Sequence, residues 1–192
     1  MLSDSARKAL LGIARQAVES AVRGVRAEMP PEQDPEVCQP QGAFVTLRTH
    51  GRLRGCIGQF IAQKPLYQTV HEMAVAAATE DPRFYSMRLR PAEMDALDVE
   101  ISVLSPLRRI KDPMAEVELG THGIYIKQGY RSGCFLPQVA TETGWSKEEF
   151  LCQCCAGKAG LSPYAWKDPR TEVLVFTAEV IEEPQAHPEV QS

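Results

Sequence analysis

The sequence predicts an α+β fold in which an antiparallel or mixed sheet is flanked by helices. Two segments read as β-hairpins and two further runs alternate as single strands do, with helical periodicity between them at uneven intervals. Strands that come in hairpins and are separated by unevenly spaced helices are typical of this fold class. The segments expected to carry strands are 44–58, 98–105, 123–137 and 171–183.

Two long helices are expected in the first half of the chain. Residues 3–28 start at Ser3, which suits the N-cap position. Residues 65–79 start at Pro65, which suits the first turn, and end before Pro82, because the residue preceding a proline disfavours helical angles. Their apolar stripes, at spacings of three and four, are Leu10, Ala14, Ala17, Ala21 and Val25 in the first helix, and Leu66, Val70, Met73 and Ala77 in the second.

Shorter elements complete the expected order. Residues 29–42 hold four prolines and are expected to form a loop, and the segment PAEMDAL (91–97) suggests a short helix. The second hairpin is expected to turn near Gly129. A capping box beginning at Ser146 predicts a helix that runs to Gly160.

The first hairpin contains the stretch GRLRGCIGQF, residues 51–60, which combines three glycines, two arginines and a cysteine. We expect a three-residue loop, Thr49-His50-Gly51, with Gly51 in the left-handed conformation. This register separates polar from apolar side chains, whereas a two-residue loop would mix them. It predicts one face with Val45, Leu47 and buried Leu53 and Ile57, and an opposite face with Arg48, exposed Arg52, Arg54 and Cys56.

Length and composition limit the class of protein. A chain of 192 residues with 44% hydrophobic residues fits a single domain, here 1–192, with a packed core. Its net charge of −4 and pI of about 5.6 disfavour a general affinity for nucleic acid or anionic lipid. No run of 18 apolar residues and no secretory signal is present, so we expect a cytoplasmic protein, no membrane contact and reduced cysteines.

Common cofactor and catalytic signatures are absent from the sequence. There is no GxGxxG, P-loop, HExxH or GxSxG pattern, and no CxxxCxxC motif for an iron–sulfur cluster, so no cofactor is expected. Gly55-Cys56-Ile57-Gly58 matches the GxxG loop of KH RNA-binding domains in two residues only. It lies at a strand end, which argues against an RNA-binding module.

Five of the six cysteines carry different expectations. Cys152, Cys154 and Cys155 do not share one helix face and lack a nearby histidine, so we expect buried small side chains and no metal site. Cys134 stands in an apolar strand and reads as core. Cys56 faces arginines in the expected register, and positive charge lowers the pKa of a thiol. Cys56 is therefore a candidate nucleophile, although a small buried thiol beside an anion-binding surface remains the alternative.

Three further residues bear on chemistry. His122, which lies between Thr121 and Gly123, could act as a general base, a ligand or a turn residue. Asp81 and Arg83 flank Pro82 in a tight segment, where a local ion pair or a helix-end cap is the simpler interpretation.

Six segments of the chain form an ordered series: GRLRGCIG (51–58), AVAAATEDPRF (74–84), VEISVLSP (99–106), GTHGIYI (120–126), LPQVATETGW (136–145) and PYAW (163–166). Together they resemble the AMMECR domain family, whose microbial members are called AmmeMemoRadiSam system protein A. The resemblance runs from about residue 5 to 183 and leaves 184–192 as a tail. Its most specific part is the Leu-Arg-Gly-Cys-Ile-Gly core.

The resemblance implies a fold of two unequal lobes with a cleft between them. It also implies a shared system with a Memo-like protein and a radical-SAM enzyme, but it assigns this component no reaction. Cys134 and the cysteines of 152–155 are outside the motif series, which directs attention to Cys56. Carried onto this chain, the motifs imply the site residues Arg54, Gly55, Cys56, Gly58, Asp81, Arg83, His122 and Gln138.

Two principal functions follow, and the sequence leaves open whether the protein is an enzyme. The first is a binding module that holds a small anionic ligand or a peptide in a cleft lined by the LRGCIG motif. The second is a thiol-dependent enzyme, with Cys56 as nucleophile, Arg54 holding an anionic substrate and His122 moving a proton. The absence of a complete catalytic constellation mildly favours the binding module.

Overall fold

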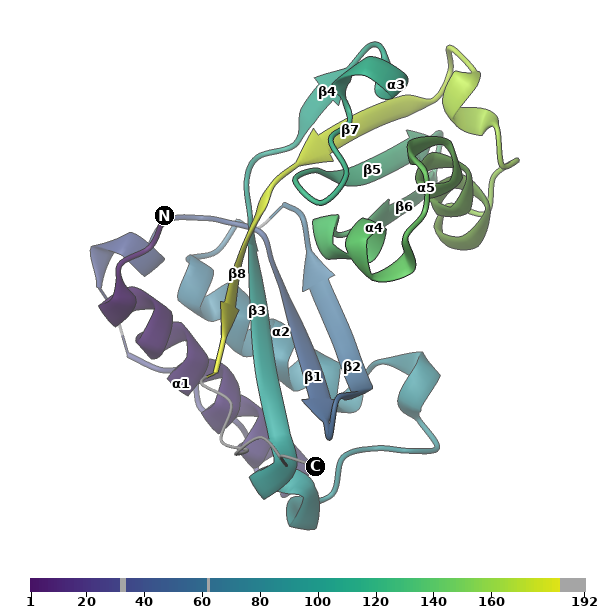
Figure 1. Cartoon of the computed structure of the whole chain (residues 1–192). Helices are drawn as coiled ribbons and strands as arrows, with labels where there is room; N and C mark the ends of the chain where they lie inside the picture. Colours follow the sequence, from purple (N-terminus) through teal and green to yellow (C-terminus); the bar gives the residue numbers. More distant parts are fainter. Residues whose placement is uncertain (32–33, 62, 184–192) are drawn as a thin grey trace, which may run out of the picture. The chain divides into compact units, whose positions relative to one another are not determined.

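The computed structural model describes residues 1–31, 34–61 and 63–183, so the predicted tail 184–192 and two residues of the predicted loop 29–42 lie outside it. The chain divides into two compact units. The first comprises 1–104 and the segment from 179 onward, and the second comprises 105–178. Each unit has a four-stranded sheet and its own helices, which confirms the α+β class (Figure 1).

The sheet of the first unit has the strand order β2-β1-β3-β8, and both long helices pack on one of its faces (Figure 1). Strand β1 pairs with β2 and β3 in antiparallel fashion. Two 3-10 helices, Pro82–Phe84 and Pro91–Ala96, connect α2 to β3. The main elements are α1 (Asp4–Val22), β1 (Ala43–Thr49), β2 (Arg52–Gln59), α2 (Leu66–Thr79), β3 (Leu97–Leu104) and β8 (Ala178–Glu182).

The core of the first unit lies between these helices and the sheet. Leu10, Ala14 and Ala17 of the predicted stripe are buried, and the Oγ of Ser3 caps α1 by accepting a hydrogen bond from the Ala6 N–H at 3.2 Å. The helix ends at Val22 rather than at 28, because the chain turns at Gly24, whose φ is 70°. Val25 is consequently exposed instead of buried.

The sheet of the second unit has the strand order β4-β7-β5-β6. Its second hairpin is confirmed and turns at Gly129, as predicted. Helix α4 and the short strand β4 escaped the sequence analysis, because neither segment is long enough to show a period. The elements are β4 (Arg108–Ile110), α3 (Pro113–Glu116), β5 (Gly123–Gln128), β6 (Arg131–Phe135), α4 (Pro137–Thr143), α5 (Lys147–Gln153) and β7 (Glu172–Phe176).

Two predicted elements are divided in the structure. The strand expected over 171–183 is two strands, β7 and β8, which belong to different sheets. Between them the Thr177 carbonyl accepts from the Ser105 N–H, and the Ser105 Oγ accepts from the Thr177 N–H, both at 2.9 Å. The helix expected from Ser146 to Gly160 begins with the predicted capping box but becomes a π-helical turn over Cys154–Lys158.

No helix in the described part of the chain is both long and apolar enough to cross a bilayer.

Candidate functional site

The hairpin that carries the LRGCIG stretch turns through two residues, His50 and Gly51. Thr49 pairs with Arg52 across the turn, and the φ angles are 50° at His50 and 72° at Gly51. Two consecutive left-handed residues are typical of a type I′ turn, whose twist matches that of the flanking strands. The predicted three-residue loop is therefore wrong, whereas the hairpin itself is confirmed.

A β-bulge at Arg54 changes the predicted alternation of side chains. Leu47 lies opposite Gly55, and Arg48 lies opposite Leu53, so Arg54 is the extra residue on β2. Directly opposed residues share a face of the sheet, so Leu53 lies on the face of Arg48. The predicted face with three arginines beside the thiol does not form.

The burial of the hairpin follows this corrected register. Arg52 is exposed, as expected, but Leu53 and Ile57 are half-buried rather than buried. Ile57 packs against the core cluster of the first unit.

Cys56 lies in a row of three side chains across the sheet face opposite the helices. Thr46 is directly opposite Cys56 on one side and directly opposite Glu100 on the other. The Thr46 hydroxyl lies 3.3 Å from the Cys56 Sγ and donates a hydrogen bond to it. Burial raises the pKa of the Cys56 thiol, and this effect outweighs the opposing effects of Thr46 and Arg83. The predicted lowering of this pKa by arginines is therefore wrong.

The backbone of Cys56 is held by an ion pair between Asp81 and Arg83. The Cys56 N–H donates to Asp81 Oδ2 at 2.9 Å, and Arg83 Nη2 donates to the Cys56 carbonyl at 3.3 Å. Arg83 Nη2 also donates to Asp81 Oδ2 at 2.6 Å. Since β2 is an edge strand, these bonds satisfy backbone groups that no strand reaches.

Asp81 is almost fully buried in this arrangement. Burial alone would raise the pKa of Asp81, but the hydrogen bonds from Arg83 and from the Cys56 N–H outweigh it and lower the pKa. The local ion pair expected for Asp81 and Arg83 is present, and it holds the motif strand as well.

Arg54 connects the hairpin to the segment that precedes β3. Its Nη1 donates to Thr49 Oγ1 at 3.0 Å and to Glu93 Oε1 at 2.5 Å, and its Nη2 donates to the Met87 carbonyl at 3.0 Å. The hydrogen bond from Arg54 is the largest influence on the pKa of Glu93, which falls to about 2. The charge of Arg54 is therefore already balanced by a carboxylate within the protein.

The motif glycines allow close packing within the first unit. A Cβ at Gly55 would lie 2.0 Å from the Ala77 carbonyl oxygen of α2, and one at Gly58 would lie 2.2 Å from the Phe44 ring. The protein's own atoms thus occupy the space beside both glycines, and their role as ligand contacts remains a prediction. The GxxG stretch lies within β2, so the resemblance to a KH loop has no structural counterpart.

His122 and Gln138 belong to the second unit, whereas Cys56 belongs to the first. The His122 N–H donates to the Glu118 carbonyl at 2.8 Å, and its Nδ1 accepts from the Glu118 N–H at 3.1 Å. These bonds are those of a turn residue that precedes β5. Gln138 is the second residue of α4 and is half-buried. Joint action of either residue with Cys56 stays a prediction.

The cysteines of the second unit are mainly packing residues. Cys154 and Cys155 are buried, and burial raises the pKa of Cys155 to about 11. Cys152 is half-buried, and its Sγ accepts a hydrogen bond from Trp166 Nε1 at 3.4 Å. Cys134, expected in the core, is half-buried in β6.

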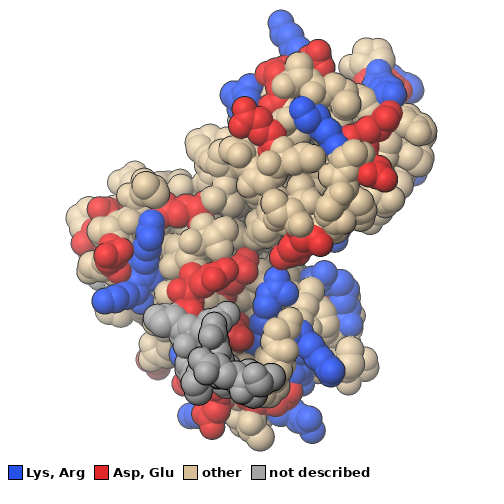
Figure 2. All heavy atoms as spheres, in the orientation of Figure 1, with Lys and Arg blue, Asp and Glu red and all other residues tan. Residues whose placement is uncertain are grey.

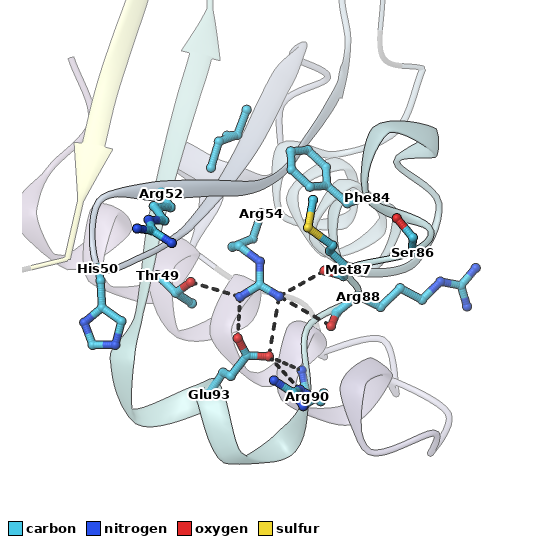
Figure 3. Close-up of a pocket in the computed structure, with 11 residues that line it drawn as sticks. Thr49, His50, Arg52, Arg54, Phe84, Ser86, Met87, Arg88, Arg90 and Glu93 are labelled. Atoms are coloured by element: carbon cyan, nitrogen blue, oxygen red, sulfur yellow. Dashed lines mark hydrogen bonds and ion pairs between the residues drawn. The ribbon is translucent and has the colours of Figure 1, made fainter.

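A cavity of about 890 Å³ lies in the first unit, beside the turn of the motif hairpin (Figure 3). One wall is the hairpin from Thr49 to Arg54, and the other is the segment from Phe84 to Glu93. Arg54 lies between the walls and bonds to both (Figure 3). The lining residues are Thr49, His50, Arg52, Leu53, Arg54, Phe84, Ser86, Met87, Arg88, Arg90 and Glu93.

The lining of this cavity is basic although the chain is acidic. It contains four arginines and one acidic residue, Glu93, in a chain of net charge −4. In the space-filling view, Lys and Arg side chains gather over the β2 side of the first unit, whereas acidic side chains lie over its middle (Figure 2). The Arg52 side chain makes no hydrogen bond or ion pair with any residue that the structure describes. The cavity therefore offers an uncompensated positive charge to a ligand.

Sequence reasoning missed several residues of this site. Thr46 and Glu100 could have been found as the cross-strand neighbours of Cys56 once the strand pairing was known. Glu93 gave no signal, because its partner Arg54 lies 39 positions earlier in the chain. Phe84 and Met87 also line the cavity, and only the apolar and basic mixture of FYSMRLR, residues 84–90, hinted at a surface role.

Two compact units, each with its own sheet, and a basic pocket beside a glycine-containing hairpin define an α+β protein with a candidate anion-binding site. The AMMECR1 family model matches residues 11–181. The chain belongs to the AMMECR1 family, as the resemblance of its motifs predicted.

Relatives of similar length support this assignment. A protein from Thermococcus gammatolerans is 45% identical over 91% of this chain and 88% of its own length. One from Methanothermobacter thermautotrophicus is 43% identical over 95% of this chain and 96% of its own. The crystal structure of the uncharacterized protein PH0010 from Pyrococcus horikoshii superimposes with a TM-score of 0.86 at 39% identity, covering 95% of this chain and 93% of that one.

Proposed function

We propose that this protein is a binding module and that its ligand is anionic and occupies the pocket beside the LRGCIG hairpin. The observation that carries the proposal is the lining of four arginines around one glutamate, with Arg52 uncompensated. Guanidinium groups bind carboxylates and phosphates through paired hydrogen bonds. A pocket of this volume suits a ligand larger than a single inorganic ion.

The motif residues contribute to this function chiefly by building the pocket. Arg54 fixes the distance between the two walls, and the Asp81–Arg83 pair holds β2 at its outer edge. Gly55 lets α2 pack against the same strand. These structural roles explain why the motif contains charged residues that already have partners within the protein.

Membership of a system with a Memo-like protein and a radical-SAM enzyme, and a cytoplasmic location, are part of the same proposal. The system membership rests on the family resemblance of the motifs, and the location rests on the expectation drawn from the sequence. A binding module fits such a system, because a component without a reaction of its own can hold an intermediate or a partner protein. Catalysis by Cys56 receives less support, since burial works against its thiolate.

Isothermal titration calorimetry with citrate, ATP and an acidic peptide, each at low ionic strength, tests the proposal. We expect the wild-type protein to bind at least one of them, and Arg52→Glu to weaken that binding at least tenfold. Arg23→Glu is the matched control, because Arg23 is an exposed arginine of the first unit outside the pocket. The proposal is wrong if none of the three binds, or if both variants bind as the wild type does.

A further inference from the structure

The exposed charges of the pocket are distributed along its walls. Arg52 projects from the hairpin, whereas Arg88 and Arg90 come from the facing segment, and Figure 3 shows the three side chains apart from one another. All three are exposed, and Arg90 is only loosely paired with Glu93, at 3.5 Å. A single phosphate is bound best by donors that converge on one point. Separated arginines instead match carboxylates spaced along an extended chain.

Apolar surface lies among these arginines. Met87 is 59% exposed, and Leu53 and Phe84 are half-buried and line the same pocket. Tyr85 is 57% exposed, and the Arg88 guanidinium lies 5.3 Å from its ring centre. Arginine, tyrosine, phenylalanine and methionine are the side chains that protein interfaces favour. An occupant that buried this surface would carry an apolar group beside its negative charges.

The pocket is also held in shape by internal contacts. Arg54 is 15% exposed and bonds to Thr49 on one wall and to the carbonyls of Met87 and Arg88 on the other. Both walls are thereby joined without a ligand. A preformed site pays less ordering entropy when an extended peptide binds.

We infer that the occupant of this pocket is an acidic peptide segment of a partner protein, in which carboxylate side chains flank an apolar one. This inference rests on the proposed function and narrows its ligand. Arg52, Arg88 and Arg90 receive the carboxylates, and Leu53, Phe84 and Met87 receive the apolar side chain. Arg54 is a positioning residue, because its donors are used within the protein.

Fluorescence anisotropy with three labelled hexapeptides tests the inference. The first probe is Glu-Glu-Leu-Phe-Glu-Glu-amide with a fluorophore on its N-terminus, the second has Ser-Gly in place of Leu-Phe, and the third has lysine in place of each glutamate. We expect the first probe to bind at least fivefold more tightly than the second, and the third not to bind. Binding of the first probe weakens as salt is raised, because its charges are exposed to screening.

Variants separate the two parts of the surface. Arg52→Glu is expected to weaken the first probe at least tenfold, and Met87→Ser at least threefold, whereas Met87→Ser leaves the second probe unchanged. Arg23→Glu serves as control, and Arg52→Ala replaces Arg52→Glu if the latter alters the thermal midpoint. Tight binding of citrate or ATP without binding of the first probe would overturn the inference and leave the proposed function standing. Equal binding of the first two probes would overturn the apolar part, and no binding of any anion would overturn both proposals.

Discussion

At the scale of single residues, the site is governed by which charges have partners. Arg54 and Arg83, the arginines that the motif makes conspicuous, are each paired with a carboxylate, whereas Arg52 is not paired with any described residue. Cys56 is half-buried beside the Thr46 hydroxyl, and the burial favours the neutral thiol. A motif residue can thus contribute to the site by holding its neighbours in place. The residue proposed to contact the ligand, Arg52, is not one of the paired arginines.

Cys56 is expected to be a slow nucleophile. Because burial raises the pKa of its thiol, the thiolate fraction at neutral pH is below that of a free cysteine. Iodoacetamide labelling, followed by peptide mass spectrometry, should show Cys56 reacting at least about tenfold more slowly in the folded protein than in urea. Labelling as fast in the folded protein as in urea would contradict this and restore the thiol-dependent enzyme as the better function.

Glu93→Gln is expected to destabilise the protein by about 1–3 kcal/mol at pH 7, because Arg54 loses a charged partner in a partly buried place. The pKa of Glu93 is about 2 in the folded protein, below its ordinary value of 4.5. Its contribution is therefore complete above pH 4.5 and lost as the pH falls toward 2. Urea denaturation should show that the difference in the free energy of unfolding between Glu93→Gln and the wild type becomes smaller as the pH falls over that range. Glu80→Gln, at an exposed residue, should change stability little at either pH.

At the scale of elements, the first hairpin is the structural centre of the site. Its turn, its bulge and its edge contacts decide where each motif side chain lies. The bulge takes Arg54 out of the alternation of side chains along β2. The ion pair of Asp81 and Arg83 bonds to backbone groups on the unpaired edge of this strand. An edge strand protected in this way is less able to pair with another chain.

Asp81→Asn is expected to loosen the edge of β2. The neutral amide keeps one acceptor oxygen but loses the charge-assisted bonds to Arg83, so the free energy of unfolding should fall by about 1–3 kcal/mol. Hydrogen exchange at the Cys56 amide should become faster relative to the amides of β1. Asp95→Asn, at an exposed position, is the control. An unchanged rate of hydrogen exchange at the Cys56 amide would show that the Asp81–Arg83 ion pair does not hold β2.

Gly55→Ala tests the packing of α2 against β2. The added Cβ would lie 2.0 Å from the Ala77 carbonyl oxygen, so the helix or the strand must move, and a loss of roughly 2 kcal/mol or more is expected. Gly12→Ala is a matched control within α1, where nothing lies within 4 Å of the new Cβ. That change should stabilise by about 0.5–1 kcal/mol. Thermal unfolding of the two variants should therefore shift in opposite directions.

Particular elements also show how much of the fold could be predicted from the sequence. Period and turn residues predicted both hairpins and the start of α5, because these signals are local. The bulge at Arg54 was missed, since a one-residue insertion looks like ordinary alternation until the partner strand is known. The division of 171–183 into β7 and β8 was missed because both halves alternate and the break at Thr177 depends on Ser105, distant in the chain.

At the scale of the whole molecule, the candidate site lies within the first unit. The residues of this site that the sequence analysis missed contact residues distant in the chain. The family motifs predicted Arg54, Cys56, Asp81 and Arg83 as site residues. The structure brings them together around β2, and their functions stay predictions. Glu93 and Met87 could not be predicted, because their roles depend on how the segment before β3 folds back on the hairpin. The second unit supplies His122 and Gln138, whose part in the function stays a prediction.

The central claim is that an anion binds beside the motif hairpin, and amide NMR spectra of the full chain titrated with the acidic hexapeptide test it most directly. We predict progressive shifts for the amides of Arg52, Leu53, Met87 and Arg88, which are lost in Arg52→Glu and kept in Arg23→Glu. Spectra that stay unchanged with the hexapeptide, with citrate and with ATP, or that change only in α1 or in the second unit, would contradict this claim.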